Sequence, residues 1–200
     1  MLNYSLFSSS IHFLKVMGYR VSKRLTTRDY RQPGQYFVTI CTYQRAHFFG
    51  RIREGEMALS PAGQVAWDYW HEIPQHHAMV RLGTFVVMPN HIHGLLEILD
   101  SNTARWGPKM RPMAEPDTVQ FLSQISPKVG DLSLIIRGYK GAVTRTVREK
   151  GYDFAWQKSF HDHVLREGEA ERIRNYIVNN PKNWEEDGFY TPDVGWDKEK

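Results

Sequence analysis

Two histidines, His91 and His93, stand one residue apart in the apolar stretch VVMPNHIHGLLEIL, which covers residues 86–99. Successive side chains of a β-strand point to opposite faces, so both imidazoles lie on one face and Ile92 lies on the other. Imidazole is the commonest metal ligand in proteins, but two ligands do not complete a structural zinc site. The pair therefore indicates an open metal site, completed by another side chain, water and substrate oxygens. Phosphate contact and mutual hydrogen bonding are the alternatives.

A second histidine triplet, HDH, covers residues 161–163 and alternates in the same way. Its outer residues, His161 and His163, lie on one face of a predicted strand, and the triplet is compatible with the surface that carries the first pair. Its central residue, Asp162, is polar. The triplet therefore fits a strand with one buried face less well than the first pair does.

Three side chains downstream, Arg172, Tyr176 and Asn180, are spaced four residues apart, which places them on one face of a helix. Tyr176 borders an apolar stripe, where packing is the ordinary role, yet this face offers a phenol nucleophile and an amide oxygen ligand one turn apart. A phenol is a poor nucleophile because its pKa is about 10, and a metal that polarises the attacked phosphate lowers the nucleophilicity required. Pro181 predicts that the backbone of Asn180 leaves the helical region.

Length and composition bound the kind of protein. The 200 residues suit one domain with or without extensions, and 41% hydrophobic and 13% aromatic residues suffice for a core. A net charge of +4 permits nucleic acid as a partner. The single cysteine, Cys41, excludes an internal disulfide and fits a reducing compartment. No apolar run is long enough to span a membrane, the N-terminus lacks the order of a signal peptide, and Met17 is a candidate alternative start.

The rest of the patterning predicts the elements that position these residues. Strands are expected from about Tyr36 to Thr42, over LGTFVVMP, over HIHGLLEIL and over FAWQKSFHDHVLR, with a tight MPN turn between the second and third. Helices are expected from the N-cap Ser60 to Pro74, onward from Asp131, and over EGEAERIRNYIVNNP.

This order is the β-α-β-β-α-β order of a ferredoxin-like α+β fold, an antiparallel sheet with helices on one face. An extra C-terminal helix carries the tyrosine. The strand with the two histidines is then central, and its imidazoles face the side that the first two helices leave open. We expect an N-terminal extension and basic arm over residues 1–33, a functional domain over residues 34–184 and a C-terminal tail over residues 185–200.

Three blocks of the sequence together resemble the single-tyrosine HUH transposases of the IS200/IS605 type and, more narrowly, the REP-associated tyrosine transposases. The blocks are MPNHIHGLLEI, WQKSFHDHVLR and RIRNYIVNNPKNW, and the opening DYRQPGQYFVTICTYQRAHFFGRI is similar as well. The resemblance is collinear from about Arg24 to Trp184. It implies that residues 34–184 form an HUH transposase domain.

The resemblance also implies roles for individual residues. His91 and His93 match the metal-binding histidines, and Tyr176 matches the tyrosine nucleophile. Asn180 stands where insertion-sequence relatives usually carry a glutamine as the third metal ligand. The implied cofactor is Mg²⁺ or Mn²⁺. Tyr139 is a rival nucleophile, but it continues an apolar stripe at helical spacing, so we favour a packing role for it.

The implied activity is cleavage and rejoining of single-stranded DNA beside hairpins such as REP-like palindromes, through a covalent 5′-phosphotyrosine, in the bacterial cytoplasm. A homodimer and a monomer both fit, and no membrane partner is expected. Two alternatives stay open: a non-catalytic, domesticated DNA-hairpin-binding protein, and a metal-dependent phosphodiesterase that uses water. Tyr43 and Phe160 are candidates for stacking on bases. Backbone contacts to DNA are expected from Arg24, Arg28, Arg137, Lys140, Arg148 and His163.

Overall fold

The computed structural model describes residues 32–100 and 131–192, and within them the main sheet has four antiparallel strands in the order β4-β5-β1-β6. The two central strands, β5 and β1, are flanked by the edge strands β4 and β6. Their bounds are Gly34–Cys41 for β1, His91–Ile98 for β5, Val80–Met88 for β4 and His161–Val164 for β6. This is the strand order of the predicted ferredoxin-like α+β fold, and the histidine strand is central, as predicted.

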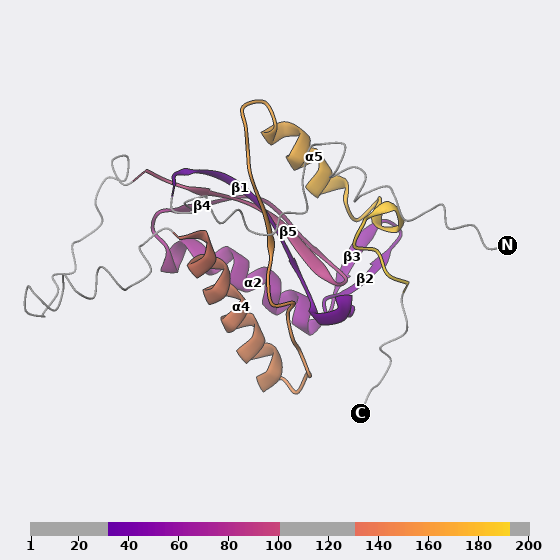
Figure 1. The fold of residues 1–200 in the computed structure, drawn as a ribbon. Coiled ribbons are helices and arrows are strands. Elements are labelled where there is room, and N and C mark those ends of the chain that lie inside the picture. The colour runs from indigo at the N-terminus through magenta and orange to yellow at the C-terminus, as the bar shows by residue number, and fades with distance from the viewer. Residues whose placement is uncertain (1–31, 101–130, 193–200) are drawn as a thin grey trace, which may run out of the picture.

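Helices cover the sheet unequally. α2 (Pro61–His76) and α4 (Leu132–Glu149) lie side by side on one face, and α5 (Ala170–Asn179) lies on the other (Figure 1). Alternate residues of the central strands, Ile92 among them, point toward α2 and α4 and form the main hydrophobic core. The face opposite Ile92 is therefore the one that α5 shares with the histidines.

A second, smaller hydrophobic cluster fixes α5 to its face of the sheet. Phe37 of β1 and Leu95 of β5 pack against Ile173 and Ile177 of the helix, and Tyr176 lies at the border of this cluster. The apolar spacing in the sequence is the cause, since residues three and four apart share one side of a helix. Packing of this apolar stripe against the sheet fixes the position and rotation of α5, and therefore where the other side chains of the helix lie.

The start of α2 follows the prediction, but its end does not. Ser60 is the N-cap, and its Oγ accepts a hydrogen bond of 3.0 Å from the backbone N–H of Gly63. The helix was predicted to end at Pro74, yet it continues to His76. Pro74 removes one N–H and crowds one carbonyl, and so close to the C-terminus only a short stretch of helix follows it.

A two-stranded hairpin, β2 (Gly50–Arg53) and β3 (Glu56–Leu59), was not predicted. Its turn consists of Glu54 and Gly55, both with positive φ, at 51° and 77°. Asn-Gly and Asp-Gly are the usual sequences of such turns, so Glu-Gly gave a weak signal. β6 is also shorter than the predicted strand, because Trp156 pairs with the sheet only through an isolated bridge to Thr42.

None of the helices formed within the described ranges is both long enough and apolar enough to cross a membrane.

Candidate active site

The two histidines of β5 face each other on the side of the sheet that carries α5. Both side chains are buried, and His91 Nε2 lies 3.0 Å from His93 Nε2. Asn90 Oδ1 lies 2.8 Å from His91 Nδ1, and an amide oxygen can only accept, so Nδ1 carries the proton. Thr39 Oγ1 lies 2.8 Å from His93 Nδ1. Hydrogen bonds at the Nδ1 atoms orient both rings so that the Nε2 atoms meet.

Burial keeps His91 neutral. It lowers the pKa of this imidazole well below its ordinary value, and the neighbouring His93 lowers it further. A neutral imidazole protonated at Nδ1 has a lone pair at Nε2, and this is the form that binds a metal. His91 is thus held as a ligand directed at the space beside His93.

Asp187 adds a carboxylate to this pair. Its Oδ2 lies 3.9 Å from His93 Nε2 and accepts a hydrogen bond of 2.7 Å from Asn180 Nδ2, while its Oδ1 accepts one of 2.6 Å from the backbone N–H of Phe189. Burial alone would raise the pKa of this carboxyl, but its hydrogen bonds and the nearby histidines hold the pKa well below its usual range. Asp187 is therefore a buried carboxylate.

Together these groups fit a divalent cation. One ligand atom from each of His91, His93 and Asp187 lies within 4.8 Å of the others. Neighbouring ligands about 2.1 Å from an octahedral ion are about 3.0 Å apart, which matches the separation of the two Nε2 atoms. Asn180 Oδ1 is also buried, without a hydrogen-bond partner in the part of the chain that the structure describes. A buried amide oxygen with no partner is costly, and a cation would satisfy it.

Tyr176 brings a phenol to the same place. Its hydroxyl donates a hydrogen bond of 3.1 Å to Asp187 Oδ2 and lies 3.3 Å from His93 Nε2. Burial raises the pKa of this phenol well above its ordinary value, and the charge of Asp187 raises it further. In the state described here the tyrosine is therefore protonated, with its proton directed at a carboxylate.

Asn180 follows Tyr176 by one turn, and its backbone differs from the prediction. Pro181 was expected to push it out of the helical region, yet its φ of −57° and ψ of −42° are helical. The restriction before proline is a preference, and here the packing of α5 outweighs it. Asn180 consequently stays on the face of Tyr176, and its amide meets Asp187.

The structure does not bring the basic residues of α4 to this site. Arg137, Lys140 and Arg148 lie on α4, on the other face of the sheet from Tyr176 (Figure 1). Lys140 Nζ donates a hydrogen bond of 2.6 Å to the carbonyl of Gln157, and Arg148 Nε donates one of 2.9 Å to the carbonyl of Phe154. Two of the three side chains thus hold the segment after α4.

The other predicted contact residues are dispersed. His163 Nε2 lies 2.8 Å from Glu169 Oε2, beside the start of α5. Tyr43 is exposed, whereas Phe160 packs against the main core. Arg24 and Arg28 lie outside the described residues.

Tyr139, the rival nucleophile, is a core residue. It is buried between α2 and α4, and its hydroxyl donates a hydrogen bond of 2.9 Å to the carbonyl of Ala66. The sheet separates it from the paired histidines. The favoured packing role agrees with this position.

Asp187, Asn90 and Thr39 were not predicted from the sequence. Asn90 directly precedes the first histidine, so its place in the turn was a usable signal. Thr39 is the cross-strand partner of His93, which requires the register to be known. Asp187 lies in the segment predicted as a tail, after Glu185 and Glu186, and nothing in its spacing distinguishes it from those exposed carboxylates.

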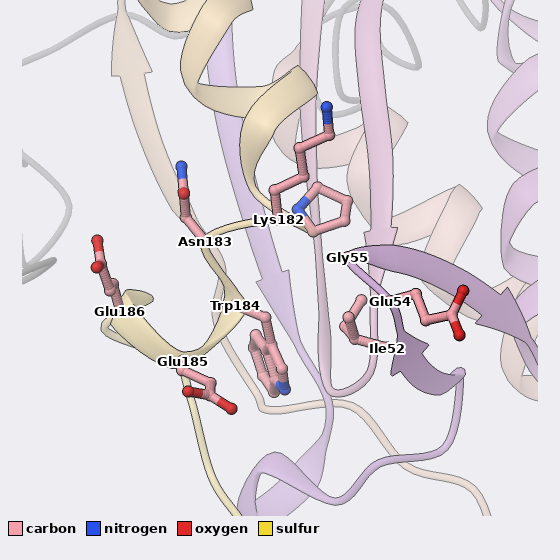
Figure 2. A pocket seen from close by; sticks show the side chains of 9 residues that line it. Ile52, Glu54, Gly55, Lys182, Asn183, Trp184, Glu185 and Glu186 are labelled. Carbon is pink, nitrogen blue, oxygen red and sulfur yellow. The ribbon is translucent and has the colours of Figure 1, made fainter.

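A pocket of about 340 Å³ lies next to the segment that links Asn180 to Asp187. Figure 2 shows Lys182 and Trp184 of this segment on one side and Ile52 and Glu54 of the β2–β3 hairpin on the other. The histidines and Tyr176 are not among its lining residues. The pocket is thus separate from the candidate site.

Comparison with known proteins gives a fold and a family. No protein-family model matches the chain. A solved structure described as a REP-associated tyrosine transposase bound to a REP hairpin aligns with a TM-score of 0.50 and 18% identity, over 79% of this chain and 73% of that chain, so the fold is transposase-like. An uncharacterized protein of Haemophilus influenzae is 33% identical over 174 residues, which are 86% of this chain and 93% of that protein. The chain therefore belongs to the family of this uncharacterized Haemophilus influenzae protein.

Proposed function

We propose that this protein is a metal-dependent endonuclease and strand transferase that acts on single-stranded DNA next to hairpins. Tyr176 is the nucleophile, and a covalent 5′-phosphotyrosine is the intermediate. His91, His93 and Asp187 would hold Mg²⁺ or Mn²⁺, and the amide oxygen of Asn180 would be a further ligand.

One observation carries the proposal. The Tyr176 hydroxyl lies 3.3 Å from an imidazole nitrogen that is itself 3.0 Å from the second imidazole. A tyrosine placed only for packing would need neither a buried histidine pair nor a buried carboxylate beside its hydroxyl. The combination suits attack on a phosphate that a cation polarises.

The residues of the chain have separate tasks in this reaction. The cation, when bound, neutralises the charge that develops on the phosphate oxygens and favours the ionised phenol. The Tyr176 oxygen forms a bond to phosphorus, and the bond from phosphorus to the 3′ oxygen breaks. The phenol proton, which is directed at Asp187, is released through this carboxylate to solvent, and the departing 3′ oxygen takes a proton from solvent and becomes a hydroxyl. Attack by a 3′-hydroxyl on the phosphotyrosine reverses these steps and rejoins strands.

The choice of a DNA hairpin as partner rests on two supports. The solved transposase with the similar fold is described as bound to a REP hairpin. The three sequence blocks that resemble REP-associated tyrosine transposases include both histidines and Tyr176. At 18% identity the fold alone is shared, so the hairpin is part of the proposal.

Cleavage of a hairpin oligonucleotide with single-stranded flanks tests the proposal. In the presence of Mn²⁺ the wild-type protein should cut the flank, and Tyr176→Phe should abolish the cut. Tyr152→Phe is the matched control, because Tyr152 is an exposed tyrosine beyond the end of α4. Equal cutting by wild type and Tyr176→Phe would assign the reaction to water. Binding without any cut by the wild type would indicate a hairpin-binding protein.

A further inference from the structure

We infer that Arg45 and His161 form a second phosphate-binding site beside the proposed metal site, where they hold a phosphodiester neighbouring the one that is cleaved. The inference rests on the proposed function for the identity of the ligand as single-stranded DNA. Neither residue was among the predicted contacts.

His161 extends the row of polar side chains across the sheet. Thr39 of β1 is paired with His93 of β5 on one side and with His161 of β6 on the other. Directly opposed residues on neighbouring strands share a face, so all three lie on the side of the sheet that α5 occupies. The row leads from the candidate metal site to the edge strand.

The side chain of His161 is half-buried, and its ring nitrogens have no hydrogen-bond partner within residues 32–100 and 131–192. Burial and the nearby Arg45 and His93 lower the pKa of this imidazole. The ring carries an N–H donor in either protonation state, and beside the Arg45 guanidinium it is suited to an anionic oxygen.

The ring of Phe189 connects this row to Arg45. Its centroid lies 4.9 Å from the His91 ring and 5.9 Å from the His93 ring. It also lies 6.1 Å from the His161 ring, and the Arg45 guanidinium carbon is 5.2 Å from the same centroid. Arg45 and His161 thus lie around one aromatic ring that is also next to His91 and His93.

The guanidinium of Arg45 has more N–H groups than its described hydrogen bond uses, and its backbone has an unusual conformation. One guanidinium nitrogen, Nη1, donates a hydrogen bond of 3.1 Å to the carbonyl of Gly188, and a guanidinium carries five N–H groups. Gln44 and Arg45 have φ values of 52° and 57°, in the left-handed region that side-chain-bearing residues rarely adopt. Such backbone persists where surrounding structure enforces it, and it is concentrated at ligand sites.

Phosphate is the ligand that fits these groups. A guanidinium binds two phosphate oxygens at once, and an imidazole N–H adds a single hydrogen bond. A DNA strand whose scissile phosphate lies at the cation carries further phosphates on either side of it. One of them would meet Arg45 and His161 across Phe189.

The test is binding to hairpin oligonucleotides in which one flank phosphate at a time is replaced by an uncharged methylphosphonate. Fluorescence anisotropy with EDTA present measures affinity without cleavage. Wild-type protein should lose about ten-fold in affinity at one position of the flank, the size expected for a charged hydrogen bond. Arg45→Gln and His161→Phe should each bind the unmodified DNA more weakly and lose clearly less than ten-fold at that position, because one of the two contacts is already absent.

Arg145→Gln is the matched control, because Arg145 is exposed on α4, on the other face of the sheet. This variant should keep the ten-fold loss at the sensitive position. If Arg45 and His161 only support the fold, their variants will weaken all oligonucleotides equally and keep that loss, which overturns the inference. So does a wild-type protein with no sensitive position. Adduct formation with Mn²⁺ is measured separately, so failure of the nuclease proposal and failure of this inference are distinguishable.

Discussion

The carboxylate of Asp187 joins the phenol to the other polar side chains of the site. One of its oxygens accepts hydrogen bonds from Tyr176 and Asn180, and the other accepts one from the backbone of Phe189. Its low pKa keeps it charged in a buried place, where its hydrogen bonds and the nearby histidines offset part of the cost of burial. A cation between Asp187 and the two imidazoles would offset more of this cost.

Asp187→Asn tests this role, because it removes the charge and keeps the shape and an acceptor for the Phe189 N–H. We expect the affinity for Mn²⁺, measured by isothermal titration calorimetry, to fall at least about ten-fold. Glu185→Gln removes an exposed carboxylate two residues away and should leave the affinity unchanged. Unchanged Mn²⁺ affinity in Asp187→Asn would exclude the carboxylate as a ligand.

At the residue scale, the sequence predicted the side chains that regular elements position. His91 and His93 share a face because strand geometry has a period of two, and Tyr176 and Asn180 share a face because they are one helical turn apart. Asp187 lies in irregular backbone after α5. Its position depends on how that segment packs onto the sheet, which no local periodicity encodes.

At the scale of elements, the contact between β5 and α2 leaves no room for a side chain at Gly94. A Cβ there would lie 2.3 Å from the ring of Trp70. Gly94 faces α2, whereas its neighbours in the strand, His93 and Leu95, face α5. The close approach at Gly94 therefore fixes the position of the histidine strand relative to α2.

Gly94→Ala should therefore destabilise the fold by about 1–3 kcal/mol or more, as overpacked cores do. Gly138→Ala is the control, since a Cβ there meets nothing within 4 Å in the interior of α4. It should stabilise the protein by about 0.5–1 kcal/mol, because alanine is the better helix former. Urea denaturation measures both. A Gly94→Ala variant as stable as wild type would show that α2 and β5 adjust freely.

The start of α5 depends on a carboxylate that titrates. Glu169 accepts hydrogen bonds from the His163 ring and from the backbone N–H of Arg166. Burial tends to raise the pKa of Glu169, but these hydrogen bonds outweigh it and hold the pKa below the ordinary value. Because the folded-state pKa is the lower one, the stabilisation is present above the unfolded-state pKa and is lost as the pH falls through the folded-state value.

Glu169→Gln should accordingly be less stable than wild type at pH 7, and the difference should shrink below about pH 4.3, the ordinary range of a glutamate. Urea midpoints of the two proteins across this range measure the effect. A difference that stays constant with pH would mean that the charge of Glu169 contributes nothing.

The elements that the sequence predicted are those with strong patterning. β1, β5 and the three described α-helices follow the expected alternation and spacing, and Ser60 caps α2 as expected. The β2–β3 hairpin is short and half-exposed, so it lacked an alternation long enough to recognise. The extension of α2 beyond Pro74 depends on tertiary packing, which outweighs the local preference.

At the scale of the whole molecule, the two faces of the sheet have different tasks. α2 and α4 bury the large core on one face, and α5 with the segment after it builds the candidate site on the other (Figure 1). In the proposed function, DNA would have to approach Tyr176 from the α5 side. Contacts from Arg137 on α4 would require DNA that extends around the edge of the sheet.

In the proposed function the phenol of Tyr176 attacks DNA beside a cation held by the paired histidines. Mass spectrometry of the protein after incubation with Mn²⁺ and a hairpin oligonucleotide, followed by nuclease and protease digestion, measures this directly. We expect a single peptide with a nucleotide attached through phosphate to Tyr176, absent with EDTA and absent in His93→Ala. A nucleotide attached to any other residue, or cut DNA with no attached peptide, would contradict it.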